Sequence, residues 1–164
     1  MNPNSVIYMR NFIFGAEDSL VSTVGLLAGV AAAGMTSDNI VLTGAVLIFV
    51  EAFSMAVGSF LAEESTEESV APATPKAVPR RGALIMFGSY FIMGFIPLFP
   101  YILFAPFTAL WVSLAFTLIT LFLLGFVSAA MLKTKLLHSA IRMLLMGGIA
   151  VLIGIGVGIF FKGV

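Results

Sequence analysis

Five apolar segments dominate the sequence, and each is long enough to cross a lipid bilayer. A membrane-spanning helix needs about 20 consecutive apolar residues, because its backbone rises by about 1.5 Å per residue. The segments cover residues 12–34, 39–62, 82–104, 107–131 and 141–161. Only 10% of the residues are charged, against about 25% in soluble domains, and the mean hydropathy is +1.14. The sequence therefore predicts an all-α integral membrane protein with five transmembrane helices.

The connections between these segments predict one helical domain that covers residues 1–164. A short polar turn, Thr36 to Asn39, joins the first two segments into an antiparallel hairpin. The only extended polar stretch is 63–81, which begins with glutamates, contains three prolines and ends with arginines. This composition is typical of a linker.

The positions of lysine and arginine predict how the chain is oriented. Cytoplasmic loops carry an excess of these residues. A cytoplasmic amino terminus places most of them inside: Arg10, Lys76, Arg80, Arg81, Lys133, Lys135 and Arg142. Only Lys162 then lies outside. Because the number of spans is odd, we expect the carboxyl terminus outside.

Three carboxylates lie within the first two apolar segments: Glu17, Asp18 and Glu51. A charged side chain near the bilayer centre costs about 2.5–3.5 kcal/mol on insertion scales. Counted outward from the hairpin turn, Asp18 and Met55 lie at equal depth, and Ser22 and Glu51 form the next pair. We therefore expect Asp18, Glu51 and Met55 to converge on one small volume. Glu17 points to another side, because neighbouring helical residues are about 100° apart.

The sequence predicts no basic partner for these acids, because no lysine, arginine or histidine lies deep in an apolar segment. Such carboxylates are either protonated or neutralised by a cation, and a group that can do both can exchange protons for metal. Carboxylate oxygens with a thioether suit iron(II) or manganese(II) better than calcium. Two alternatives stay open. The acids can be structural, hydrogen-bonded across helices in protonated form, and Met55 can be a core residue.

Four more glutamates follow the second segment: Glu63, Glu64, Glu67 and Glu68. Acids at the carboxyl end of a helix are opposed by its dipole, and like charges four residues apart repel each other. These glutamates are either a solvated helix end or a mouth that collects cations.

The remaining features exclude several classes of protein. The chain has no cysteine and no net charge, which excludes thiolate metal sites and a polybasic nucleic-acid binder. No pairing of nucleophile and base indicates an enzyme, and we expect no permanently bound cofactor. Small residues at four-residue spacing, which allow close helix contacts, occur at Gly25 and Gly29 and at Gly154 and Gly158.

Three stretches resemble the first three helices of the vacuolar iron transporter family: RNFIFGAEDSLVSTVGLLAGVAAA, EAFSMAVGSFLAEES and SYFIMGFIPLFPY. The helical pair after Ala109 resembles the fourth and fifth. The resemblance implies a five-helix protomer, a homodimer, and an ion path at the dimer interface lined by the first two helices. Asp18 matches the family's intramembrane aspartate, and Met55 matches its methionine.

The chain also departs from this family's pattern. Asn11 stands where the family often has a second aspartate, and Leu47 where plant-type members have a glutamate. The cytoplasmic metal-binding domain after the second helix is missing, so the chain is a short form. We expect a proton-coupled exporter of iron(II) or manganese(II), in the cell membrane of a prokaryote or a vacuolar-type membrane of a eukaryote. The alternative is a non-transporting membrane scaffold or assembly subunit.

Overall fold

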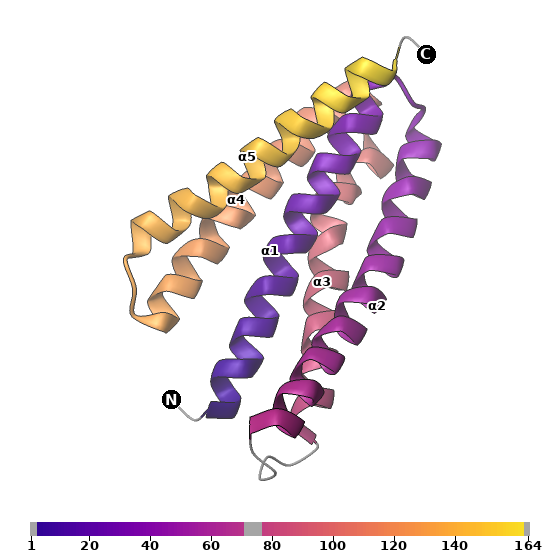
Figure 1. Cartoon of the computed structure of the whole chain (residues 1–164). Helices are drawn as coiled ribbons and strands as arrows, with labels where there is room; N and C mark the ends of the chain where they lie inside the picture. Colours follow the sequence, from indigo (N-terminus) through magenta and orange to yellow (C-terminus); the bar gives the residue numbers. More distant parts are fainter. Residues whose placement is uncertain (1–2, 71–76, 163–164) are drawn as a thin grey trace.

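The computed structural model describes residues 3–70 and 77–162, which form five helices. They are α1 (Pro3–Ala32), α2 (Ser37–Val70), α3 (Ala77–Leu103), α4 (Pro106–Leu132) and α5 (Leu136–Phe161) (Figure 1). Each helix is long and apolar enough to cross a membrane. The prediction of an all-α membrane protein with five spans is confirmed.

The helices are longer than the apolar segments that predicted them. α1 begins at Pro3, and α2 continues through the glutamates to Val70. Within the predicted linker 63–81, residues 63–70 therefore end α2 and residues 77–81 begin α3, whereas 71–76 lie outside the described residues. Glutamate has a good helix propensity, and water can solvate the last backbone carbonyls, so nothing requires α2 to end where the apolar run ends.

Successive helices of the bundle run in opposite directions. The start of α1, the end of α2 and the start of α3 lie at one end, and the α1–α2 turn and the end of α5 lie at the other (Figure 1). Gly34 provides the reversal between α1 and α2, because its φ of 88° lies in the left-handed region that favours glycine. Lys133 ends α4 in the left-handed conformation, and its backbone N–H donates to carbonyls of the last turn.

Helix α3 lies against both arms of the predicted hairpin. α1 packs mainly on α3 and α5, α2 packs mainly on α3, and direct contact between α1 and α2 is smaller. The arms of the hairpin are thus separated along the middle of their length, with α3 behind them (Figure 1), and they meet again at the far end through contacts of Glu63 with Arg10 and Asn11.

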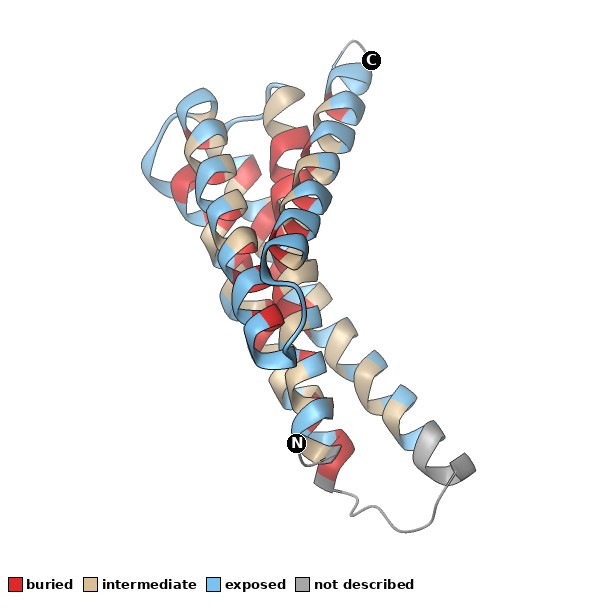
Figure 2. Ribbon diagram, turned by 90° about the vertical axis from the view of Figure 1, so that its left-hand side faces the viewer, coloured by how far each residue is buried: buried red, intermediate tan, exposed pale blue. Residues whose placement is uncertain are grey.

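Burial follows the inside of the bundle (Figure 2). Large side chains such as Leu27, Ile48 and Leu98 are fully enclosed where α1, α2 and α3 meet. The outer surface is apolar as well, and Phe53 and Leu152 expose 66% and 71% of their area. Exposed apolar side chains around a helical bundle are what contact with lipid tails requires.

The glycines at four-residue spacing on α1 and α5 are partners of each other. A Cβ on Gly154 would collide with the carbonyl oxygen of Gly25, and one on Gly158 would collide with that of Gly29. Backbones approach this closely only where side chains are absent. The contact fixes α1 against α5, and with it the position of the acids on α1.

Gly154→Ala is therefore expected to destabilise the protein by about 2 kcal/mol, because an overpacked contact must force the two helices apart. Gly156→Ala on the same helix is the matched control, since nothing lies within 4 Å of its Cβ position. Thermal unfolding in mild detergent measures both variants. Equal melting temperatures for the two would contradict the close α1–α5 contact.

Candidate functional site

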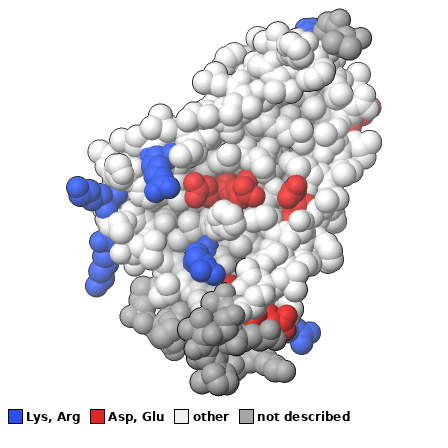
Figure 3. All heavy atoms as spheres, viewed as in Figure 1, with Lys and Arg blue, Asp and Glu red and all other residues white. Residues whose placement is uncertain are grey.

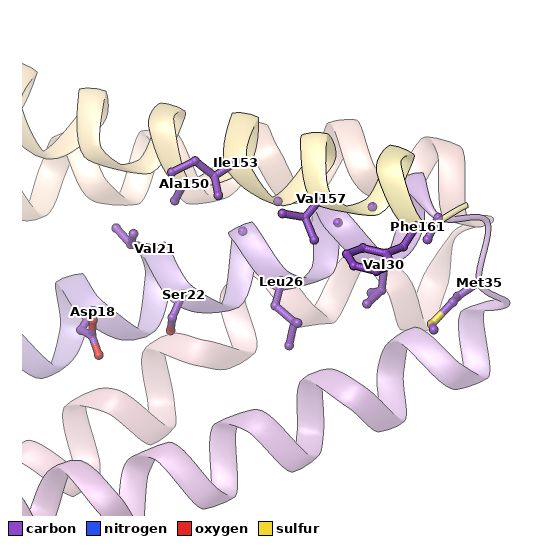
Figure 4. Close-up of a pocket in the computed structure, with 15 residues that line it drawn as sticks. Asp18, Val21, Ser22, Leu26, Val30, Met35, Ala150, Ile153, Val157 and Phe161 are labelled. Carbon is purple, nitrogen blue, oxygen red and sulfur yellow. The ribbon is translucent and has the colours of Figure 1, made fainter. Parts of the chain in front are cut away.

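Packing of α1 on α3 decides where Asp18 points. Gly15 and Ser19 face α3: a Cβ on Gly15 would collide with Ser89, and the Ser19 hydroxyl donates to the carbonyl oxygen of Tyr90 at 2.6 Å. Asp18 lies at the edge of this face, about 60° from Gly15 and about 100° from Ser19 around the helix. Its side chain extends towards α2, whereas the Ser22 hydroxyl reaches that of Tyr90 on α3 (Figure 4).

The structure brings Asp18 and Glu51 together. Both side chains are partly buried, and they lie close enough for their charges to interact. Within residues 3–70 and 77–162, neither carboxylate forms a hydrogen bond or an ion pair. Two acids that face each other without such partners repel when both are ionised. A proton or a cation between them removes this repulsion.

Tyr90 is a polar neighbour that sequence reasoning missed. It lies on α3, has no exposed surface, and interacts electrostatically with both Asp18 and Glu51. Its hydroxyl lies 2.8 Å from the Ser22 hydroxyl, and either group can donate. A tyrosine in the middle of an apolar span was a signal, because its hydroxyl needs a partner inside the membrane.

Met55 and Asp18 line different cavities. Asp18 lies in a groove of about 610 Å³ that runs along α1 and α5 (Figure 4). Met55 lines a cavity of about 640 Å³ between α1, α2 and α3, which also contains Ser59, Met86 and Asn11. The thioether therefore belongs to the space that leads towards the amino-terminal end of α1.

Glu17 has a basic neighbour, which corrects the expectation that none of the three acids has one. Arg142, near the start of α5, lies close enough to Glu17 for their charges to interact. The sequence places Arg142 in the last apolar segment and Glu17 in the first, so only the packing of α5 on α1 joins them. Glu17 therefore lies near α5.

Of the four glutamates that follow the second apolar segment, Glu63 and Glu64 have different surroundings in the structure. Glu63 is almost buried, accepts a hydrogen bond from Asn11 Nδ2 at 2.7 Å, and pairs with Arg10 at 3.3 Å. Glu64 is exposed. Glu67 and Glu68 lie outside the residues whose side chains are described.

The charged side chains of the site form a small cluster on an otherwise apolar surface. Acidic side chains lie near the middle of the face in Figure 3, with basic side chains below them and to one side. In the described part of the chain, no three His, Asp or Glu side chains gather tightly enough to hold a metal ion. In this part of the chain, Asp18 and Glu51 are therefore a pair without a third acidic or histidine side chain close enough to share a metal ion with them.

Ionisable side chains within membrane-spanning helices, here Asp18 and Glu51, typically mark the pathway of an ion or substrate, which indicates the class of membrane transport proteins. The model of the VIT family matches residues 9–77 and 67–159, which is nearly the whole chain. The chain belongs to this family, the vacuolar iron transporters, whose members transport metal ions across membranes and are not enzymes. The two matched parts meet between α2 and α3, where the sequence predicts a missing cytoplasmic domain. No curated protein matches the chain.

Proposed function

We propose that the protein exports iron(II) or manganese(II) from the cytoplasm in exchange for protons. The observation that carries this proposal is the pair Asp18 and Glu51, two neighbouring carboxylates without hydrogen bonds or salt bridges in the described structure. A divalent cation neutralises both when it binds, and two protons neutralise both when it leaves. In both the metal-bound and the protonated state, the apolar bundle contains no uncompensated negative charge at this pair.

The ligands of the path favour a transition metal. Carboxylate oxygens bind all divalent cations, whereas a thioether prefers the softer ones. Met55 and Met86 both line the cavity between α1, α2 and α3, so an ion that passes through this cavity on its way to Asp18 meets sulfur as well as oxygen. Tyr90, whose hydroxyl contacts that of Ser22, interacts electrostatically with both carboxylates and thus senses a change in their charge.

The proposed path lies between two copies of the chain. One chain offers two facing acids and an open groove beside Asp18, which leaves metal coordination incomplete. A second copy, related by twofold symmetry, doubles the carboxylates and closes the groove against lipid. Light scattering of the purified protein measures this, and a stable monomer that still transports metal would contradict it.

The orientation follows from charge. The amino-terminal end of the bundle carries Arg10, Arg80 and Arg81, so we place it in the cytoplasm. Metal then enters near Met55 and leaves towards the α1–α2 turn.

Metal uptake into proteoliposomes tests the function directly. With the amino-terminal end facing outward, iron(II) and manganese(II) are expected to enter at least about tenfold faster than calcium, because only the softer ions gain from the thioethers. Protein-free liposomes provide the background. Uptake of calcium at the same rate as manganese would contradict the selectivity, and no uptake of any ion would favour the scaffold alternative.

A further inference from the structure

A second buried carboxylate lies at the amino-terminal end of α1, outside the pair of acids described above. Glu63 exposes only 10% of its side chain, although it stands near the end of α2. Its Oε1 accepts a hydrogen bond from Asn11 Nδ2 at 2.7 Å and pairs with Arg10 Nη2 at 3.3 Å. Its Oε2 is buried and has no hydrogen-bond partner among the described residues. A buried carboxylate with one unpaired oxygen is costly unless a cation or a proton shares it.

The backbone of α3 keeps room for this carboxylate. A Cβ on Gly82 would lie 2.7 Å from Glu63 Oε2 and 2.6 Å from Asn11 Nδ2. A side chain at Gly82 would therefore require Glu63 and Asn11 to move, so the glycine leaves room for the carboxylate at this position. Glu63 is thus held at a defined position, unlike the exposed Glu64 beside it.

Two further oxygen donors accompany Glu63. Ser59 lies one turn earlier on the same face of α2, and its Oγ is also buried without a hydrogen-bond partner in the described structure. Asn11 uses its NH₂ group towards Glu63, which leaves its amide oxygen as an acceptor. Ser59 and Asn11 both line the cavity of about 640 Å³ that extends to Met55. Carboxylate, amide and hydroxyl oxygens are suitable ligands for manganese(II).

The position of Arg10 allows an incoming cation to displace it from Glu63. Its side chain is 66% exposed and approaches Glu63 through one contact of 3.3 Å. Ion pairs with an exposed partner are weak, because water competes for the charge and the long side chain loses freedom. A divalent cation on Glu63 repels the guanidinium, which can swing into water without breaking other contacts of the bundle.

We propose that Glu63, Asn11 and Ser59 form an entry site for a divalent cation at the mouth of the cavity that leads to Met55. Arg10 occupies the site when the cation is absent. This inference rests on the proposed function, because the cation is the transported metal. One carboxylate with neutral oxygens holds the ion weakly enough to pass it on, as conduction through successive sites requires.

Manganese(II) binding to the purified full-length chain in detergent tests the entry site, with bound ions counted per chain by electron paramagnetic resonance. The wild-type protein is expected to show a tight class and a weaker class of bound ions. Glu63→Gln removes the weaker class. Arg10→Gln strengthens it about fivefold, because a competing cation is gone. Asp38→Asn, which removes an exposed acid at the opposite end, leaves both classes unchanged.

Asp18→Asn separates this inference from the proposed function, because it should remove the tight class and retain the weaker one. If Asp18→Asn removes the tight class while Glu63→Gln changes nothing, the entry site is overturned and the transport site stands. If the wild-type protein binds no manganese(II), both proposals fail.

A purely structural role for Glu63 gives a different result. Glu63→Gln and Arg10→Gln would then lower the melting temperature without changing manganese(II) binding, which overturns the entry site. Should Glu63→Gln fail to fold, Arg10→Gln decides the question, and an unchanged affinity of the weaker class overturns the proposal.

Discussion

Asp18→Asn is expected to lower the rate of metal uptake into proteoliposomes by about 100-fold or more. The substitution keeps the size of the side chain and removes its charge, so Glu51 can no longer share a divalent cation with it. Even groups that only support a metal ligand change affinity by about 10- to 100-fold, and loss of a ligand costs at least as much. Since the Asp18 carboxylate makes no hydrogen bond or ion pair in the described structure, the fold should not depend on it.

Two measurements accompany this experiment. Size-exclusion chromatography and the melting temperature should match those of the wild-type protein, because no contact of the bundle is lost. Asp38→Asn removes an acid that is exposed at the α1–α2 turn, and it should transport at the wild-type rate. Unchanged uptake by a folded Asp18→Asn protein would eliminate the proposed mechanism, and loss of folding would instead support the structural alternative for this acid.

Sequence reasoning predicted the helices and the depth of polar residues well. Length and hydropathy suffice to identify a span, because a bilayer has a fixed thickness. Depth along a hairpin follows from a constant rise per residue, and this count placed Asp18 level with Met55 and Ser22 level with Glu51. In the structure Asp18 lies near Glu51, whereas Met55 lines a different cavity. The same count, applied further out, pairs Arg10 with Glu63 at equal distance from the turn, and the structure joins these two residues by an ion pair.

Lateral packing was much harder to predict. Helical spacing places Gly15, Asp18 and Gly25 on one broad face, yet Gly15 packs on α3 and Gly25 packs on α5. Every face of an apolar membrane helix is compatible with either lipid or protein, so hydrophobicity does not say which neighbour covers it. For this reason, only the structure reveals that Glu17 lies near Arg142 and that Tyr90 lies near Asp18 and Glu51.

Metal accumulation is expected to follow an imposed pH gradient. If two carboxylates release two protons for each divalent ion, the exchange is electroneutral. An interior that is one pH unit more acidic then supports about a 100-fold metal gradient, since each proton contributes a factor of ten. Proteoliposomes with an acidic interior and manganese(II) outside should therefore accumulate the ion well above the outside concentration. Without the pH gradient, uptake should stop when the two concentrations are equal.

The dependence on pH also identifies the groups that carry the protons. The logarithm of the accumulation ratio should rise with a slope of about two per pH unit for the wild-type protein, and an imposed membrane potential should not change it. Glu51→Gln leaves one titrating carboxylate in the pair, so any accumulation that remains should rise with a slope of about one. A passive channel would give the same final level at every pH gradient, because equilibration of the metal alone involves no proton, and that result would exclude proton exchange at Asp18 and Glu51.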